Sequence, residues 1–326
     1  MSVLRILQKY LDKEKMNKTV LITGGAGFIG SHIADRMLEN NYHVRIYDNL
    51  STGKIENIAH INSHIEFIEG DIRDVKKLER SMKGCDLVFH EAAEVSVPRT
   101  IKSPVETTMI NDVGTLNVFE SARQTDVQRV VFASSCAIYG DSPELPKHEH
   151  LVPNPKSPYA AQKIMGEYYA RLYNDLYQLE TVCLRYFNVF GPRQDPSSPY
   201  SGVISIFLTK AIAGQTPTIY GDGTQSRDFI YVKDVVNANV LAATQSEVNG
   251  NVFNIGTGQM RSINDLWQSI CHESNISIAA RYEKGRAGDI LASVGDIQRA
   301  GQKLNFVPQY HFDHGLKETL AWYAIL

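Results

Sequence analysis

Residues 23–32, TGGAGFIGSH, connect a short apolar run to a helical pattern. Gly25, Gly27 and Gly30 have the spacing G-x-G-x-x-G, and Gly24, Gly27 and Gly30 have the spacing G-x-x-G-x-x-G. Glycine permits a tight turn and lets a phosphate group approach the backbone, because no Cβ stands in the way. The helix N-terminus that follows supplies unpaired N–H groups and a dipole that favours an anion. This context predicts a turn that binds the pyrophosphate of a dinucleotide.

Asp48 is the acidic residue that such a turn requires further along the chain. It ends the next apolar run, 18 residues after Gly30. A carboxylate there can accept hydrogen bonds from both hydroxyls of the adenosine ribose, and it would repel a 2′-phosphate. The alternative is a strand–helix turn without a ligand, which Asp48 makes the weaker interpretation. The pair of signals therefore predicts NAD rather than NADP as the cofactor.

Apolar runs alternate with helical patterns through the first half of the chain. Such continuous apolar runs are typical of a parallel sheet that is covered on both faces. The predicted fold class is α/β: a doubly wound parallel (Rossmann) sheet with a smaller C-terminal α/β substrate lobe. The expected strands lie at residues 18–23, 42–48, 64–71, 86–93 and 129–135.

The pattern changes after about residue 187, where loops rich in proline, glycine and serine appear. We expect an NAD-binding domain at residues 18–187, which also receives segments near 229–258, and an interleaved, mainly substrate-binding lobe at 188–326. Residues 1–17 predict an N-terminal helical extension, because their apolar side chains fall on one helical face. That helix is expected to pack on the outside of the domain, with a role at a membrane surface as the alternative.

Composition excludes several classes of protein. The chain has 326 residues, 33 basic against 36 acidic side chains and a net charge of −3, which argues against a nucleic-acid binder. No apolar run is long enough to span a bilayer. The four cysteines lie far apart without metal-ligand spacing, so no metal site is expected, and reduced thiols fit a cytoplasmic protein.

Ser135, Tyr159 and Lys163 form the candidate catalytic set. Ser135 ends an apolar run, and Tyr159 and Lys163 have the four-residue spacing that places two side chains on one helical face. A nearby ammonium lowers the pKa of a phenol, so that tyrosinate can act as a general base toward a sugar hydroxyl. The serine hydroxyl can bond the same reacting oxygen. An isolated Y-x-x-x-K is common on exposed helices, and the glycine-rich turn upstream favours the catalytic interpretation.

Other cofactor contacts are expected where the parallel strands end, since ligands of open α/β sheets bind at the carboxyl edge. Asp71 and Ile72 follow the third run, where they would flank the adenine. Ala92 and Ala93 follow the fourth, where small side chains let a cofactor approach. These four residues mark one edge of the expected crevice.

Seven motifs together resemble the extended short-chain dehydrogenase/reductase family. More narrowly the chain is similar to nucleotide-sugar epimerases of the UDP-galactose 4-epimerase type, with the pattern of UDP-N-acetylglucosamine 4-epimerases. The resemblance runs from about Lys18 to the C-terminus, with the motifs in the family's order. They are TGGAGFIGSH, HEAAEVSVPR, ASSCAIYG, PYAAQK, LRYFNVFGPRQ, GDGTQSRDFIYV and RAGD.

The resemblance implies a role for each matching residue. Tyr159 would be the base and acid, Lys163 its tuner and ribose ligand, and Ser135 the proton-relay partner. The implied NAD contacts are Gly24, Gly27, Phe28, Ile29, Gly30, Asp48, Asn49, Ser51, Gly53, Asp71, Ile72, Ala92, Ala93, Asn111, Tyr159, Lys163 and Tyr186. The implied substrate contacts are Ser96, Ser135, Asn188, Val203, Tyr220, Arg227, Arg286, Asp289 and Ser293.

The resemblance implies reversible oxidation of a UDP-hexose at C4. A 4-ketosugar would turn over in the site and be reduced on its other face, so that NAD is regenerated. Related dehydratases carry an Asp-Glu pair where this chain has Cys136-Ala137, which favours simple epimerisation. A UDP-glucuronate 4-epimerase, a net reductase and a non-catalytic nucleotide-sugar or NAD sensor on the same fold stay open as alternatives.

Ser293 occupies the position that walls the sugar pocket in the family. A small serine there leaves room for a 2-acetamido group, so UDP-GlcNAc and UDP-GalNAc are the expected substrates. UDP-Glc and UDP-Gal are expected as additional substrates. The alternative is that Ser293 only packs and selectivity lies elsewhere.

The resemblance also implies a homodimer. Helices near 104–125 and 159–179 pair across the dimer axis in relatives, and their apolar faces include Val118, Phe119, Tyr168 and Tyr169. The alternative is that these side chains are buried within one subunit.

Overall fold

The computed structural model describes residues 18–196, 202–285 and 290–325. The predicted N-terminal extension and two predicted substrate contacts, Arg286 and Asp289, lie outside these residues. In the described part of the chain no helix has the length and apolar character needed to cross a membrane. Over the same residues no cluster of histidine, cysteine and acidic side chains is suited to hold a metal ion.

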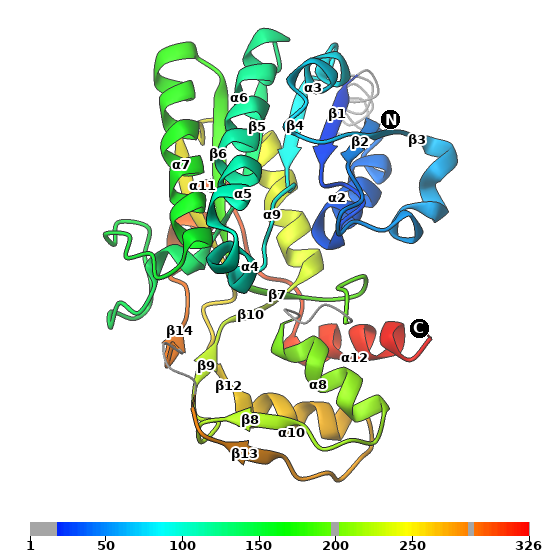
Figure 1. The fold of residues 1–326 in the computed structure, drawn as a ribbon, viewed down its shortest axis with the longest axis vertical. Coiled ribbons are helices and arrows are strands. Elements are labelled where there is room, and N and C mark those ends of the chain that lie inside the picture. The colour runs from blue at the N-terminus through cyan, green and yellow to red at the C-terminus, as the bar shows by residue number, and fades with distance from the viewer. Residues whose placement is uncertain (1–17, 197–201, 286–289, 326) are drawn as a thin grey trace, which may run out of the picture.

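A seven-stranded sheet, parallel throughout, forms the larger part of the molecule (Figure 1). Its strand order is β11-β6-β5-β4-β1-β2-β3. The predicted doubly wound α/β fold is therefore confirmed. The strands are β1 (Thr19–Thr23), β2 (His43–Asp48), β3 (Ile65–Glu69), β4 (Leu87–His90), β5 (Arg129–Ser135), β6 (Glu180–Tyr186) and β11 (Asn251–Ile255).

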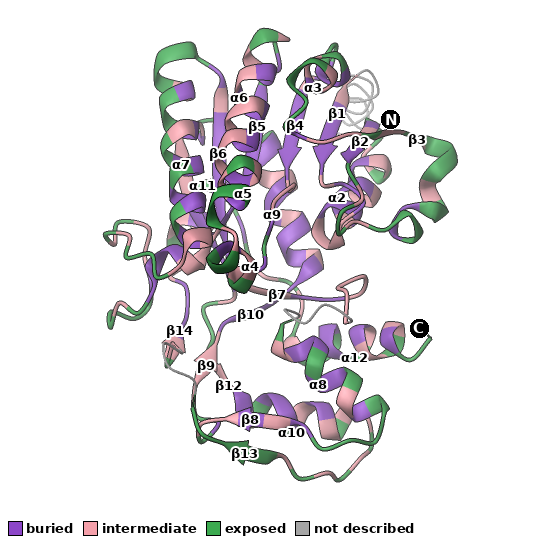
Figure 2. Cartoon of the chain, in the orientation of Figure 1, coloured by how far each residue is buried: buried purple, intermediate pink, exposed green. Residues whose placement is uncertain are grey.

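Helices cover both faces of this sheet, because successive side chains of a buried strand point to opposite faces. In β1, Ile22 packs with the helices α2 (Phe28–Glu39) and α9 (Val232–Thr244), whereas Leu21 packs on the other face. The helices on that second face are α3 (Val75–Met82), α6 (Gly114–Gln124) and α7 (Pro158–Tyr177). Figure 2 shows the buried strands between these half-exposed helices.

The helical pattern predicted near 104–125 is not one regular helix. It consists of α5 (Pro104–Thr108), a π-helical turn η3 (Met109–Val113) and α6. Val118 and Phe119 of α6 are fully buried against the sheet, so the expectation that they face a second subunit is wrong for these two residues. They are the apolar side of an amphipathic helix whose partner is the subunit's own core.

A smaller lobe lies beyond the carboxyl edge of the large sheet, in the lower part of Figure 1. Its helices are α8 (Val203–Ile212), α10 (Ile263–Glu273) and α12 (Phe312–Tyr323). Short strands join them: β8 (Thr218–Tyr220) pairs with β13 (Arg281–Glu283), and β9 (Ser226–Arg227) lies between β12 (Arg261–Ser262) and β14 (Ala292–Ser293). The chain enters the lobe, returns through α9 and β11 to the large sheet, and then leaves again.

One parallel strand pair lies between the two parts of the molecule. In it β7 (Asn188–Phe190) pairs with β10 (Phe229–Tyr231). Beside the sheet α11 (Gln298–Leu304) packs on β11, and α4 (Val97–Lys102) and the short turns η1 (Ile55–Asn57), η2 (Ala59–His64) and η4 (Cys136–Tyr139) complete the described elements. The carboxyl edge of the large sheet therefore faces the lobe.

Candidate active site

The glycine-rich turn lies between β1 and α2, as predicted. Gly24 has a φ of +70°, and a Cβ there would lie 2.7 Å from the backbone nitrogen of Ala92. A Cβ on Gly30 would overlap the carbonyl oxygen of Gly24. Gly27 is the N-cap of α2 and supplies no side-chain cap, so the first N–H groups of the helix, at Phe28 and Ile29, are free to bind an anion. The turn thus has the close backbone approach that a pyrophosphate needs.

Asp48 lies buried at the end of β2, beside this turn. Its carboxylate accepts hydrogen bonds from the N–H groups of Ala26 (3.0 Å) and Leu50 (2.8 Å). Burial raises the pKa of the Asp48 carboxyl, and these two hydrogen bonds act in the opposite direction. Gly53 packs against both carboxylate oxygens, where a Cβ would lie within 2.8 Å of each. A donor pair such as the ribose hydroxyls can still reach the remaining lone pairs.

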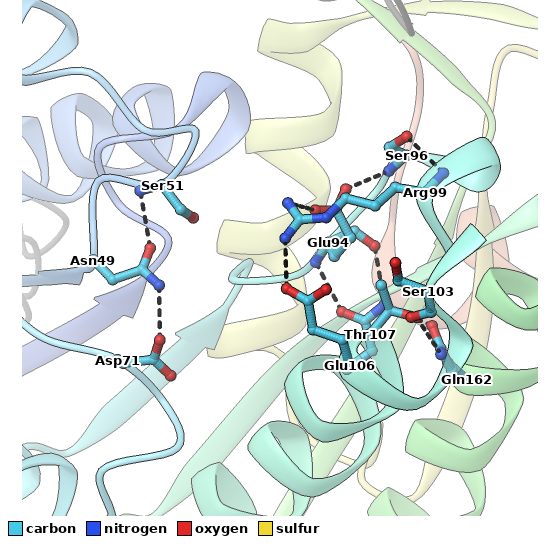
Figure 3. A network of polar contacts seen from close by, with 11 residues as sticks. Asn49, Ser51, Asp71, Glu94, Ser96, Arg99, Ser103, Glu106, Thr107 and Gln162 are labelled. Atoms are coloured by element: carbon cyan, nitrogen blue, oxygen red, sulfur yellow. Dashed lines mark hydrogen bonds and ion pairs between the residues drawn. The ribbon is translucent and has the colours of Figure 1, made fainter. Parts of the chain in front are cut away.

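The neighbouring strand end adds the other predicted adenosine contacts. Asn49 donates from its amide to Asp71 (2.9 Å) and accepts from the backbone N–H of Ser51 (3.0 Å), as Figure 3 shows. The Arg73 guanidinium forks onto Asp71 and holds the pKa of that carboxyl well below its usual range. Ile72 is buried and its side chain packs against the backbone of α6 at Gly114.

Asn111 and Ser96 hold the loop after β4 in place. Asn111 accepts from the Glu94 N–H (2.8 Å) and donates to the Glu94 carbonyl (2.9 Å) and to the side chain of Gln162 (2.7 Å). Ser96 caps α4, and the Arg99 guanidinium bonds Glu94 (2.6 Å; Figure 3). These two predicted ligand contacts therefore also fix the segment that carries Ala92 and Ala93 at the edge of the crevice.

The three predicted catalytic residues lie together where β5 ends and α7 begins. Ser135 is the last residue of β5, and Tyr159 and Lys163 occupy the first turns of α7, whose N-cap is Ser157. The Lys163 Nζ donates to the carbonyl of Ala133 (2.7 Å) and lies 5.8 Å from the centre of the Tyr159 ring. The set thus has one hydroxyl, one phenol and one buried ammonium at the carboxyl edge of the sheet.

The electrostatics of Tyr159 differ from the sequence-based expectation. Burial raises the pKa of the Tyr159 phenol to about 12, although a hydrogen bond with Ser135 acts in the opposite direction. The expected lowering of this pKa by Lys163 is not found, because the Lys163 ammonium donates to the carbonyl of Ala133 instead. Formation of tyrosinate therefore needs a change that substrate and cofactor bring, such as a cationic ring nearby.

The smaller lobe brings Arg227 and Ser293 to the same place. They lie opposite each other where β9 pairs with β14. The Cys136 thiol, next to Ser135 in the chain, is close enough to feel both: burial raises its pKa to about 12, while the Arg227 charge and a hydrogen bond with Ser293 act in the opposite direction. Ser293 is buried. The remaining described substrate candidates begin or end short elements: Asn188 starts β7, Val203 starts α8 and Tyr220 ends β8.

Residues 20–256 match the model of the NAD dependent epimerase/dehydratase family. The chain belongs to this family. NAD is accordingly its cofactor, and the glycine turn and the Asp48 carboxylate fit that group: the turn has no room for a Cβ, and the carboxylate keeps lone pairs for two hydroxyl donors.

Members of the epimerase/dehydratase family match over nearly the whole chain. A provisionally named UDP-glucose 4-epimerase of Methanocaldococcus jannaschii is 44% identical over 93% of this chain and 97% of its own length. The UDP-N-acetylglucosamine 4-epimerase of Methanobrevibacter ruminantium, solved with UDP-N-acetylmuramic acid, is 42% identical, covers 94% of this chain and 98% of its own, and has a TM-score of 0.91. The Thermus thermophilus UDP-glucose 4-epimerase, solved with NAD, is 36% identical over 94% and 98%, with a TM-score of 0.84.

Two carboxylates of this epimerase/dehydratase chain escaped the sequence analysis. Glu91 follows β4 and accepts a hydrogen bond from the Tyr186 phenol (2.9 Å). Asp112 lies in η3 with a buried, unpaired Oδ1 among the described residues. Burial lowers the pKa of Lys163 to about 8, and both carboxylates oppose that shift. For Glu91 the sequence signal was an acidic residue at the end of an apolar run, and hydrophobic periodicity does not predict a role for such a residue.

Proposed function

We propose that this protein is an NAD-dependent UDP-hexose 4-epimerase whose main substrates are UDP-GlcNAc and UDP-GalNAc, with UDP-Glc and UDP-Gal as further substrates. The observation that carries the proposal is the meeting of Ser135, Tyr159 and Lys163 with Arg227 and Ser293 at one edge of the sheet. A cofactor domain supplies the first three, and the smaller lobe supplies the other two.

The reaction uses these groups in a fixed order. Tyr159, as tyrosinate, takes the proton of the sugar 4-hydroxyl, and Ser135 bonds the same oxygen. NAD, when bound, accepts the hydride from C4 and later returns it. The 4-ketosugar turns about its diphosphate, so that the hydride would return to the other face of C4 and invert it, while Tyr159 gives the proton back to the 4-oxygen. Arg227 suits the diphosphate, because a guanidinium makes paired, charge-assisted hydrogen bonds with phosphate.

The residues after Ser135 support epimerisation over elimination. A dehydratase needs an acid and a base to remove the 6-hydroxyl and a neighbouring proton. Cys136 and Ala137 occupy the first turn of η4 at this place, and burial keeps the Cys136 thiol protonated with a pKa of about 12. A protonated thiol cannot act as a base, and alanine has no titratable group, so these two positions do not supply the acid and base pair of an elimination.

The proposed preference for acetylated sugars rests on Ser293. Its small side chain is buried and lies against Cys136, beside the catalytic serine. A bulky residue at this position would fill space next to the hexose. The Methanobrevibacter relative is named a UDP-N-acetylglucosamine 4-epimerase, which supports the proposed preference for acetylated sugars.

The test is to incubate the protein with UDP-GlcNAc, without added NAD, and to follow UDP-GalNAc by chromatography. Product is expected, since the cofactor stays bound and is regenerated. If no product forms although NAD is confirmed in the protein, the proposed 4-epimerase activity is refuted and a non-catalytic nucleotide-sugar sensor is favoured. Turnover of UDP-glucuronate alone would instead support the uronate epimerase.

Ser293→Tyr tests the sugar preference. The added ring should lower kcat/KM for UDP-GlcNAc at least about tenfold more than for UDP-Glc, because only the acetylated sugar needs the space. Ser293→Ala is the matched control and should keep the wild-type ratio. If both sugars lose activity in the same proportion in Ser293→Tyr, Ser293 does not select the substrate.

We also propose a homodimer that forms through α7. Its exposed apolar side chains Met165, Tyr168, Leu172 and Leu176 recur at helical spacing, and Val105 of the adjacent α5 is 78% exposed. Figure 2 shows this outer side of α7 alternating between exposed and half-buried residues. A second copy would cover the stripe with its own, since a two-fold axis pairs like surfaces. A cytoplasmic location completes the proposal.

A further inference from the structure

Glu91 is a carboxylate at the reaction centre for which the proposed function has no use. It follows β4 directly, and its N–H donates to the carbonyl of Thr23 at the end of β1 (3.1 Å). The next residue, Ala92, lies against Gly24 of the glycine-rich turn. Glu91 thus lies at the carboxyl edge of the two central strands, where ligands of this fold bind.

Two side chains behind Glu91, those of Tyr186 and Asn239, form a hydrogen-bonded chain with it. Asn239 of α9 is fully buried and donates from its amide to the Tyr186 phenol oxygen (2.7 Å). The single phenol proton of Tyr186 has two acceptors within reach, Glu91 Oε1 (2.9 Å) and the Asn239 side-chain oxygen (3.0 Å). A charged carboxylate is a stronger acceptor than an amide oxygen, so the hydrogen bond from Tyr186 stabilises the charged form of Glu91.

The second oxygen of Glu91 borders open space. In residues 18–196, 202–285 and 290–325 no hydrogen-bond donor reaches Oε2, and Glu91 is only partly buried. Burial raises the pKa of Glu91, and the Lys163 ammonium opposes that rise. Burial also raises the pKa of Tyr159, and the Glu91 charge adds to that rise. The carboxylate is therefore close to both catalytic side chains without being consumed by either.

Charges around this point do not cancel. Lys163 is the cation, and Glu91 and Asp112 face it from β4 and η3. Glu167, also on α7, is neutralised by a two-pronged ion pair with Arg185 (2.7 and 2.9 Å). Burial keeps His90 neutral by lowering its pKa to about 3. Above about pH 7, where the Glu91 carboxyl is charged, Glu91 and Asp112 are two carboxylates that face the single Lys163 ammonium in the described part of the chain.

We propose that Glu91, held by Tyr186 and Asn239, is an electrostatic partner of the nicotinamide that keeps the bound cofactor in its oxidised form. The oxidised ring carries a positive charge and the reduced ring carries none. A nearby fixed carboxylate therefore stabilises NAD⁺ relative to NADH. An enzyme without net redox chemistry needs this bias, because a protein left with NADH after the ketosugar escapes cannot begin another cycle.

Glu91→Gln tests the proposal by nucleotide binding. Glutamine keeps the size and the acceptor for Tyr186 but removes the charge. The protein is equilibrated with equal NAD⁺ and NADH, freed of unbound nucleotide, and the bound forms are quantified by chromatography. At about pH 8 the variant should shift the bound ratio toward NADH by about tenfold. An unchanged ratio overturns the proposal.

The pH dependence gives a second readout. Burial raises the pKa of Glu91 to about 7, so the wild-type carboxyl is charged above that pH and protonated below it. The difference between wild type and Glu91→Gln should therefore be large at about pH 8 and small at about pH 6. Tyr186→Phe removes a donor that lowers this pKa, so its transition should move to higher pH. A variant ratio as pH-dependent as that of the wild type would contradict the assignment.

Asp112→Asn is the matched control, since it also removes a carboxylate that faces Lys163 but has no link to Tyr186. It should shift the bound ratio less than Glu91→Gln does. An equal shift would assign the bias to the net charge around Lys163 and refute the role of Glu91. The inference rests on NAD binding and requires no turnover, so its failure is distinguishable from a failure of the proposed 4-epimerase activity.

Discussion

Tyr159, the proposed catalytic base, has a pKa that opposes this role. Burial raises the pKa of its phenol to about 12, although the phenol forms a hydrogen bond with Ser135 that acts in the opposite direction. One helical turn away, Lys163 is held by the carbonyl of Ala133 rather than by the phenol. The Tyr159 phenol is therefore protonated at neutral pH, and we expect it to act as a base only when nearby charges lower its pKa.

Tyr159→Phe should lower epimerisation at least about 100-fold, because the proton acceptor for the sugar hydroxyl is lost. NAD should remain bound, since the glycine turn and Asp48 are untouched. Turnover is measured by chromatography of the UDP-sugars, and bound NAD is measured after denaturing the protein. Tyr168→Phe, on the exposed side of the same helix, is the control and should match the wild type. A Tyr159→Phe protein with near wild-type turnover would remove Tyr159 from the mechanism.

At the scale of elements, α7 is tied to the two strands that flank the site. Ser134 of β5 donates to Glu167 of α7, and Arg185 of β6 forms a buried ion pair with the same carboxylate (2.7 Å). Removing one partner of such a pair leaves an uncompensated charge, which is strongly destabilising. The network therefore holds the middle of α7 against the ends of β5 and β6.

The tight packing of the turn between β1 and α2 can be tested by substitution of Gly30. Gly30→Ala should lower both NAD affinity and thermal stability, because its Cβ would overlap the Gly24 carbonyl and force the turn to move. We expect at least a tenfold loss of NAD affinity in a fluorescence titration, about 1.4 kcal/mol or more.

Gly301→Ala in α11 is the control for that substitution. Its Cβ would be 3.7 Å from the nearest atom, the Phe306 carbonyl, and Gly301 is not a left-handed residue. Alanine there should leave NAD affinity unchanged and keep or slightly raise the melting temperature. Equal behaviour of the two variants would show that the glycine turn is not packed as tightly as its geometry requires.

For the whole molecule, the chain path decides what meets at the site. The chain leaves the sheet after β6, builds part of the lobe, and returns through α9 and β11. Asn239 of α9 thereby comes to lie behind Tyr186, while the lobe places Arg227 and Ser293 beside Cys136. We therefore expect the proposed site to need residues from both parts of the molecule.

The proposed association of two subunits through α7 can be tested by substitution. Leu172→Glu should convert the proposed dimer to a monomer, because it places a charge in the middle of the apolar stripe of α7. Light scattering after size exclusion gives the mass. Val307→Glu changes an exposed apolar residue outside that helix and should leave the dimer intact. A monomeric wild type, or a dimer that survives Leu172→Glu, would refute the proposed interface.

The sequence by itself determined the features that depend on local spacing. Strand periodicity predicts the parallel sheet, the glycine spacing predicts the turn, and the four-residue spacing of Tyr159 and Lys163 places both on one helix face. Asp48 belongs with them, since the strand that it ends lies beside the one that leads into the turn.

Only the tertiary structure decided which distant residues meet. Glu91 and Tyr186 are 95 positions apart in the sequence, and Cys136 and Ser293 come from different parts of the molecule. Burial also decided the sign of the pKa shift at Tyr159, against the expectation from its lysine neighbour. The physical reason is that desolvation and long-range pairing depend on how the chain packs, whereas sequence periodicity reports only which side of an element is apolar.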